Sequence, residues 1–398
     1  MNIVNSYSSS DEEPQQATNK FITMTPKLYN LMQREKSKEV QQEQMEEGNR
    51  SIKVTKSKPL ITPGSEQITK HQDINLMQLP KSDYHFKTIG NAQVCAIPKK
   101  CIFTYSGHKK GVNCSRFFPN YGHLFVSGSN DCTIKIWDVY RQKQCIATMT
   151  SHNKGVRDLN WSHTGGKLIS ASFDKYVKIF DIRKEKPLFN WTVDRIPYVV
   201  VFHPQKENIF LVGCGDRKVY QVDSKANEIV HTYAEHKGQI NSISFFGDGL
   251  RFASTADDKS LKIYELNSPM AIAHKSEPNQ HSLSSVVMHP DGEWILCQSF
   301  SNSILCFGSS DKYRISKKRK FVGHDIASYG CTINTSPDGK FVLSGDSHGK
   351  CFIWNWKNQK LLTTFTNHKQ VVMDCQWHPQ EPSKVMTASW DTTIKLYE

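Results

Sequence analysis

A histidine, a serine and an aspartate recur together along this chain, and these are the three components of a hydrolase triad. His108 is followed by Ser127, Asp131 and Trp137. In a triad, the aspartate orients the histidine, which takes the proton of the serine hydroxyl so that its oxygen can attack a carbonyl carbon. The same groups also form a structural chain of hydrogen bonds, from carboxylate to imidazole to hydroxyl, with an indole N–H as a further donor.

The set occurs four times, which favours the structural interpretation. An enzyme needs one accessible nucleophile, whereas equivalent copies indicate a repeated structural unit, so we expect no catalytic residue. Phe180 stands where the first set has its tryptophan and lacks the donor, while the last two sets keep a tyrosine hydroxyl there. The other sets are His152, Ser170 and Asp174; His236, Ser254, Asp258 and Tyr264; and His368, Thr387, Asp391 and Tyr397.

Seven units of similar length must position these side chains. Each unit ends in a two-residue pair, and the spacings between successive second members are 43, 42, 42, 43, 47 and 43 residues. This period, with four short strands in each unit, is typical of a propeller blade. The units resemble WD repeats, so the sequence predicts an all-β fold, a seven-bladed WD-repeat β-propeller over residues 95–398. The pairs are Trp137-Asp138, Phe180-Asp181, Val222-Asp223, Tyr264-Glu265, Phe307-Gly308, Trp354-Asn355 and Tyr397-Glu398.

The first and last strands of the repeat region predict how the ring closes. The last repeat stops after Ile394–Tyr397 and lacks an outermost strand, whereas the apolar run Cys101–Tyr105 belongs to no complete repeat. Pairing these two segments in one blade removes the exposed edges of an open ring. Blades three and five lack most of the repeated set, since Val212 and Cys297 replace its serine and Ser301 an aspartate. We expect apolar packing to hold those two blades.

Residues 1–94 have no propeller pattern and are predicted to be an extended, mostly disordered arm. A short helix is expected near 26–47, because Thr25-Pro26 is a typical helix start and Gly48 a typical end. Its apolar face covers only about two turns, too little for independent stability.

Composition and motifs indicate a protein that needs no cofactor and no membrane. The chain holds eleven cysteines, scattered without a C-x-x-C pair, which favours reduced thiols over disulfides or zinc ligands. No apolar stretch is long enough for a membrane span and no signal peptide is recognisable. Phosphate-binding loops, zinc-hydrolase motifs and the G-x-S-x-G motif are missing, so we expect no small-molecule substrate.

One face of the ring is predicted to bind partners. Of the net charge of +13, residues 1–95 carry +1 (12 Lys and Arg against 11 Asp and Glu), so the ring carries about +12. Loops after the blade histidines open on one face and add lysines, which attract nucleic acid or acidic proteins. A solvated rim, or aromatic side chains half-buried against a neighbouring blade, are the alternatives. The candidates are Lys109, Lys110, Lys154, Lys237 and Lys369, with the aromatic residues Phe173, Phe300 and Trp390.

A second basic cluster lies in the insert that lengthens one period to 47 residues. A short run of this kind predicts either a nuclear-import signal or an RNA-phosphate contact. It consists of Arg314, Lys317, Lys318, Arg319 and Lys320.

Several segments outside the generic repeat positions resemble the pre-mRNA-processing factor 17 family. They include Val156-Arg157-Asp158, Arg195-Ile196-Pro197-Tyr198, Trp354-Asn355-Trp356-Lys357 and Trp377-His378-Pro379. The resemblance implies a nuclear, non-enzymatic scaffold of the spliceosome that supports the second step of splicing, exon ligation. Its implied partners are spliceosomal proteins and snRNP, with possible contact to snRNA or pre-mRNA.

One segment also fits a different functional class of WD-repeat protein. Phe180-Asp181-Ile182-Arg183 resembles the W-D-x-R box of WD-repeat substrate receptors of cullin-type ubiquitin ligases. The box is imperfect, because phenylalanine replaces its tryptophan.

Overall fold

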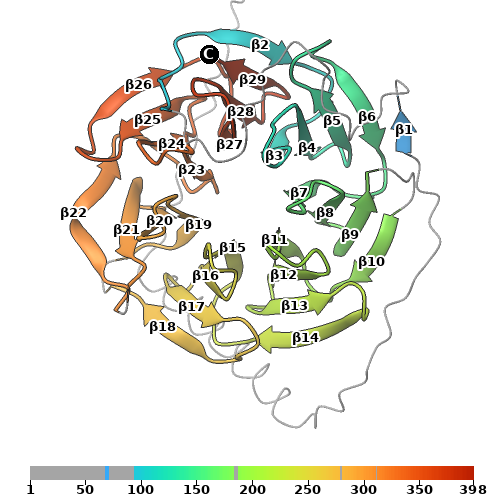
Figure 1. Cartoon of the computed structure of the whole chain (residues 1–398), viewed down its shortest axis with the longest axis vertical. Coiled ribbons are helices and arrows are strands. Elements are labelled where there is room, and N and C mark those ends of the chain that lie inside the picture. Colours follow the sequence, from blue (N-terminus) through green and yellow to red (C-terminus); the bar gives the residue numbers. More distant parts are fainter. Residues whose placement is uncertain (1–67, 71–93, 183–186, 278–279, 311) are drawn as a thin grey trace, which may run out of the picture. The chain divides into compact units, whose positions relative to one another are not determined.

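The described part of the chain forms seven antiparallel sheets around a central axis (Figure 1). The computed structural model describes residues 68–70, 94–182, 187–277, 280–310 and 312–398, and among these it contains strands and no helix. The predicted helix near 26–47 lies outside these residues. The seven-bladed propeller predicted from the repeat period is confirmed, while the domain boundary at 94/95 stays a prediction.

Every blade is built on four strands that run from the centre of the ring outward. Blade one contains β3 (Val112–Phe117), β4 (Leu124–Ser129), β5 (Ile134–Asp138) and β6 (Cys145–Met149); blade two β7 (Val156–Trp161), β8 (Lys167–Ser172), β9 (Tyr176–Asp181) and β10 (Pro187–Thr192). Blade three contains β11 (Pro197–Phe202), β12 (Ile209–Cys214), β13 (Val219–Asp223) and β14 (Glu228–Tyr233); blade four β15 (Ile240–Phe245), β16 (Arg251–Ala256), β17 (Leu261–Glu265) and β18 (Ala271–Lys275). Blade five contains β19 (Leu283–Met288), β20 (Trp294–Ser299), β21 (Ser303–Gly308) and β22 (Ile315–Val322); blade six β23 (Ile333–Thr335), β24 (Phe341–Gly345), β25 (Cys351–Asn355) and β26 (Leu361–Phe365). Blade seven contains β27 (Val372–Trp377), β28 (Val385–Ser389), β29 (Ile394–Tyr397) and β2 (Cys101–Tyr105).

Blade one has a fifth strand at its outer edge. The strand β1 (Ile68–Lys70) pairs antiparallel with β6, with Ile68 opposite Met149 and Lys70 opposite Ala147. A segment of the predicted arm therefore covers this edge.

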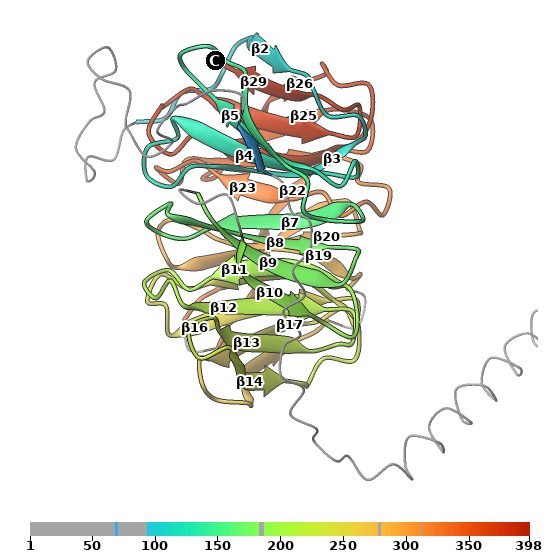
Figure 2. The ribbon, with the colours of Figure 1, turned by 90° about the vertical axis from the view of Figure 1, so that its right-hand side faces the viewer.

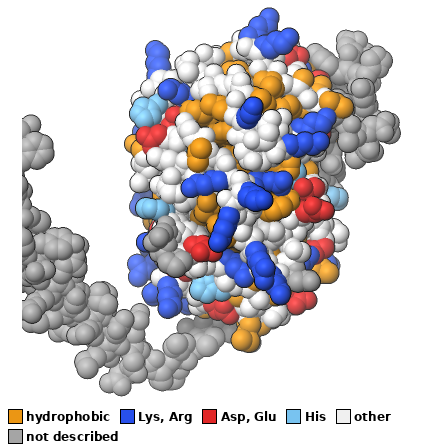
Figure 3. All heavy atoms as spheres, turned by 90° about the vertical axis from the view of Figure 1, so that its left-hand side faces the viewer, with side chains coloured by type: hydrophobic (Ala, Val, Ile, Leu, Met, Phe, Trp, Pro, Cys, Tyr) orange, Lys and Arg blue, Asp and Glu red, His pale blue; other side chains and the backbone are white. Residues whose placement is uncertain are grey.

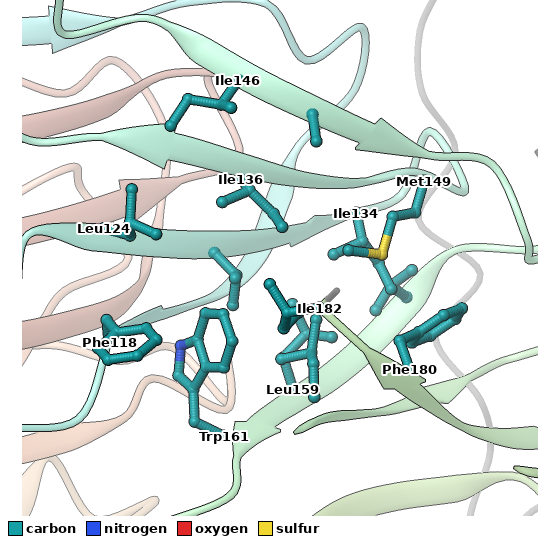
Figure 4. Close-up of a cluster of buried hydrophobic side chains, with 14 of the residues drawn as sticks. Phe118, Leu124, Ile134, Ile136, Ile146, Met149, Leu159, Trp161, Phe180 and Ile182 are labelled. Atoms are coloured by element: carbon teal, nitrogen blue, oxygen red, sulfur yellow. The ribbon is translucent and has the colours of Figure 1, made fainter. Parts of the chain in front are cut away.

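The apolar core lies between neighbouring blades. All six residues of β4 are buried, because this strand packs against a neighbour on both faces. Figure 4 shows one such cluster, in which Leu124 and Ile136 of blade one face Leu159 and Trp161 of blade two. In the side view of Figure 2, the strands of blades one, two and three follow one another from the top of the ring to the bottom.

The ring closes as the sequence predicted. β2 pairs antiparallel with β29, with Thr104 opposite Lys395 and Tyr105 opposite Ile394. The backbone of Glu398 also exchanges hydrogen bonds of 2.9 Å with Lys100. Strands from both ends of the repeat region therefore complete blade seven.

At two junctions between blades, an aromatic ring packs closely against a glycine of the neighbouring blade. The His378 ring of blade seven lies against Gly122 of blade one, and a Cβ at Gly122 would lie 2.2 Å from His378 Nε2. Phe118 of blade one lies in the same way against Gly165 of blade two, where a Cβ would be 2.2 Å from the ring. Both glycines have a positive φ, 63° and 74°, so any side chain there would clash and strain the backbone.

Candidate partner-binding face

The four residues of the first repeated set form a continuous chain of hydrogen bonds. Asp131 Oδ2 lies 2.9 Å from His108 Nδ1, and His108 Nε2 lies 2.7 Å from Ser127 Oγ. Trp137 Nε1 donates to the same Ser127 Oγ at 2.7 Å. This series of hydrogen bonds therefore links the turn of the blade to the middle of its strands.

Blades two, four and seven repeat this arrangement. The distance between the aspartate and histidine is 2.9 Å, 2.9 Å and 2.8 Å, and each histidine Nε2 lies 2.7 Å from the hydroxyl oxygen. The hydroxyl residues Ser127, Ser170, Ser254 and Thr387 are all 0% exposed. No substrate can reach such a hydroxyl without unfolding the blade, so the geometry supports structural networks.

The tyrosine at the fourth position of blade four behaves differently from the prediction. The Tyr264 hydroxyl is buried and has no hydrogen-bond partner among the described residues. Its ring instead stacks on Phe252 with centroids 5.3 Å apart and packs against Tyr233 at 5.1 Å. The phenol therefore contributes ring packing and not a hydrogen bond.

In the network of blade one, electrostatics assign an ionised aspartate and a neutral histidine. Burial raises the pKa of Asp131, but hydrogen bonds from His108, Thr133 and the Lys109 backbone outweigh it and hold that pKa well below its ordinary value. The same balance lowers the pKa of Asp174 to about 2. Burial lowers the pKa of His108. His108 therefore donates through Nδ1–H to the carboxylate and accepts the serine hydroxyl at Nε2.

The aspartates also hold the loops that carry the predicted lysines. Asp131 Oδ2 accepts the backbone N–H of Lys109 at 2.9 Å, and Asp391 Oδ2 accepts that of Lys369 at 3.1 Å. In blade four the Lys237 N–H donates to the turn aspartate at 2.9 Å. The networks thus fix the backbone from which exposed lysines project. The exposed side chains are those of Lys109, Lys110, Lys154, Lys237 and Lys369.

The three predicted aromatic residues are half-buried. Trp390 Nε1 donates to Asn113 Oδ1 at 3.0 Å across the junction of blades seven and one, and its ring packs edge-on against Tyr329 of blade six. Phe300, like Trp390, packs against the small cluster that contains Ile326. Phe173 is also half-buried. Trp390 and Phe300 therefore pack between blades, while their role in binding a partner stays a prediction.

Blade six contains a network that the sequence did not predict. His324 Nε2 accepts from the amide of Gln298 in blade five at 2.6 Å, while Trp354 Nε1 donates to Val322 O at 3.1 Å. Burial lowers the pKa of His324 to about 4. In this blade His348 occupies the turn position where the other networks have an aspartate. This replacement was the feature of the sequence that could have indicated a different network.

The innermost strands carry a second feature absent from the prediction. Arg116 of blade one donates to Asp374 of blade seven, and at 3.1 Å to Asp158 of blade two. These residues line a central cavity of about 310 Å³. Asp374 and Asp158 also accept the backbone N–H groups of Ser115 and Val200 from the next blade. The ion pairs therefore join three blades.

Blades three and five lack the repeated set, as predicted, and blade three has a substitute. Asp216 accepts a hydrogen bond of 2.5 Å from the Tyr220 hydroxyl instead of a histidine. Val212 and Cys297 are fully buried in apolar clusters between blades. The Ser301 hydroxyl donates to Ser299 Oγ at 3.0 Å and lies 2.8 Å from Ser303 Oγ.

The second basic cluster lies at the outer rim, in and before β22. Arg314, Lys317, Lys318 and Lys320 are exposed and Arg319 is half-buried. The residues Phe180 and Ile182 of the box-like segment are buried, and Arg183 lies outside the described residues. Within the described ranges we find no group of three potential metal ligands and no helix long and apolar enough to cross a membrane.

Comparison with known proteins reveals a repeat family and its relatives. The family model "WD domain, G-beta repeat" matches residues 99–138, 143–181, 227–265, 315–355 and 359–398. The chain is 39% identical over 346 residues to Pre-mRNA-processing factor 17 of Homo sapiens, covering 84% of this chain and 60% of that protein. It is 35% identical over 296 residues to Pre-mRNA-processing factor 17 of Saccharomyces cerevisiae, covering 73% and 65%.

A more distant relative completes the comparison. WD repeat-containing protein 25 of Mus musculus is 26% identical over 310 residues, covering 76% of this chain and 58% of that protein. The chain spans about three fifths of the length of the curated relatives it matches. The two long stretches between family-model matches contain the three inner strands of blades three and five, which lack the repeated histidine.

Proposed function

Since this chain belongs to the WD domain, G-beta repeat family, we propose that it is a non-enzymatic scaffold of the spliceosome. The carrying observation is the 35% to 42% identity to three proteins named Pre-mRNA-processing factor 17, over most of the chain. Propellers of this family generally hold other macromolecules together. We propose that this one acts in the nucleus and supports the second step of splicing, exon ligation.

The lysine-bearing face is the proposed docking surface. Its lysines project from loops fixed by ionised aspartates, so their charges are presented in a defined arrangement. The four hydroxyls of the repeated networks are buried, which supports binding rather than catalysis. The partners are spliceosomal proteins and snRNP, with snRNA or pre-mRNA at RNA-rich surfaces. The function requires neither a cofactor nor a small-molecule substrate.

A depleted splicing extract tests the assignment to the second step. Removal of the protein should leave the cleaved 5′ exon and the lariat-intron intermediate unligated, and the recombinant chain should restore ligation. Accumulation of unspliced precursor would place the function earlier, and normal splicing in the depleted extract would remove the proposal.

Charge reversal tests the docking face. Lys109→Glu, Lys110→Glu and Lys154→Glu together should weaken co-purification of splicing proteins, most strongly at low salt, because surface charges are screened within about 8 Å at physiological salt. Phe173→Ala should weaken it with little salt dependence, since apolar contact is not screened. Unchanged co-purification by both variants at all salts would exclude this face.

A further inference from the structure

The insert of the fifth blade forms a bulge in its outermost strand. Leu305 of β21 lies opposite Lys320 of β22, and Phe307 lies opposite Ile315. One residue of β21, at 306, therefore lies opposite four residues of β22, at 316–319. The three additional residues cannot fit in the ladder, so this segment must project from the blade.

One arginine anchors the bulge to the protein. The Arg319 guanidinium carbon lies 4.5 Å from the ring centre of Trp294 and 4.2 Å from that of Trp356. Trp356 is held in turn by stacking on Phe321. The Arg319 backbone N–H also donates to Ser316 Oγ at 3.1 Å, which spans the bulge. The projecting segment is thus fixed at its base by two aromatic contacts and one hydrogen bond.

The other cations in the bulge and directly beside it lie at the surface. Arg314, Lys317, Lys318 and Lys320 are exposed, and none of them forms an ion pair within the described ranges. Figure 3 views this side of the ring and shows Lys and Arg side chains gathered over it. Unpaired, adjacent positive charges repel one another, and a polyanion relieves that repulsion on binding.

We propose that this basic bulge binds the phosphate backbone of RNA without reading its sequence. The inference deepens the proposed function, on which it rests, by naming RNA as the partner at this rim. Lysines interact with phosphates as point charges, and the tryptophans beside them are covered by Arg319 and cannot stack bases. An import receptor that recognised the segment as an extended peptide would have to break the pairings of Ile315 and Lys320 that flank the bulge, which favours RNA as the occupant.

Fluorescence anisotropy of the full chain with a labelled RNA duplex of arbitrary sequence tests this proposal. Lys317→Glu with Lys318→Glu should weaken binding about tenfold and reduce the slope of log affinity against log salt by about two, since two phosphate contacts are lost. The matched control is Lys206→Glu with Lys225→Glu, which reverses two exposed lysines of blade three and should keep the parental slope. A second duplex of scrambled sequence should bind the parent equally well.

The outcomes separate this proposal from the proposed function. Parental affinity and slope in the Lys317 and Lys318 variant would overturn RNA binding, as would equal losses in the control variant. Binding of an import receptor or an acidic peptide, with no affinity for the duplex, would assign the bulge to a protein. The assay uses purified protein, so failure of the depleted-extract experiment would leave its result intact.

Discussion

The ionised aspartate is the residue on which each repeated network depends. Asp131 accepts hydrogen bonds from His108, from Thr133 and from the Lys109 backbone, so its removal leaves several donors without a partner. Unsatisfied buried donors cost far more than a lost surface hydrogen bond. The lysine-bearing loop of blade one would lose its attachment as well.

We therefore predict that Asp131→Ala lowers the free energy of unfolding by about 3 kcal/mol, the scale of a broken buried network. Urea denaturation measures this change. Asp216→Ala is the matched control, because Asp216 occupies the same turn position in a blade without the histidine. It should cost about 1 kcal/mol. Equal losses in the two variants would contradict the role assigned to the network.

The His378 imidazole gives the protein a predictable sensitivity to acid. Its Nδ1 accepts the backbone N–H groups of Gln380 and Glu381, and its Nε2 lies 3.1 Å from Gly122 O. This arrangement fits only the neutral ring. Burial lowers the pKa of His378 to about 3 from an ordinary 6.5.

Because the pKa of His378 is lowered in the folded protein, below about pH 6.5 this histidine binds a proton in the unfolded chain but not in the folded chain. Stability should be constant above that pH and should fall below it, by up to about 1.4 kcal/mol per pH unit for this group. Urea midpoints between about pH 7.5 and about pH 5 measure the slope. His378→Gln should make the slope shallower; an unchanged slope would contradict the assignment.

At the level of elements, the contact of an aromatic ring with a glycine determines how adjacent blades meet. The Gly122 turn of blade one receives the His378 ring of blade seven, and no other residue leaves room for it. The contact joins blade seven, which closes the ring, to blade one. A side chain at Gly122 would therefore act on the interface between two blades.

We predict that Gly122→Ala lowers the free energy of unfolding by about 3 kcal/mol or more, because the positive φ and the clash with the ring add together. Gly292→Ala is a matched control. Gly292 has a similar φ of 72°, but nothing lies within 4 Å of its added Cβ. Its cost should be about 1 to 2 kcal/mol, the backbone strain alone. Chemical denaturation of both variants separates strain from packing, and equal costs would show that the ring contact contributes nothing.

For the whole molecule, closure of the ring makes seven sheets into one cooperative unit. β29 pairs with β28 on one side and with β2 on the other. Deleting residues 394–398 removes both pairings and leaves two unpaired edges. We predict that the shortened chain loses the single cooperative thermal transition and aggregates, because free edges pair with other chains. Circular dichroism melting checks this.

Deletion of Glu398 alone is the control, since it leaves β29 intact. That variant should melt cooperatively. If the chain lacking 394–398 also melts cooperatively at the parental temperature, β29 does not close the ring.

Features that depend on local spacing could be predicted from the order of residues alone. The period of 42 to 47 residues specified seven blades, and the spacing of His108, Ser127 and Asp131 specified a network within one blade. These three residues lie within about one β-hairpin of one another along the chain, so the geometry of the hairpin sets the distances between their side chains. The unpaired run Cys101–Tyr105 likewise indicated how the ring closes.

The contacts between blades, in contrast, became visible only in the folded ring. Arg116 meets Asp374, 258 residues away, and His378 meets Gly122, 256 residues away. No local pattern marks such pairs, because their approach depends on the curvature of the closed ring. The Tyr264 hydroxyl was misassigned for a related reason: a side-chain type gives a possible donor, while the surrounding packing decides where its oxygen lies.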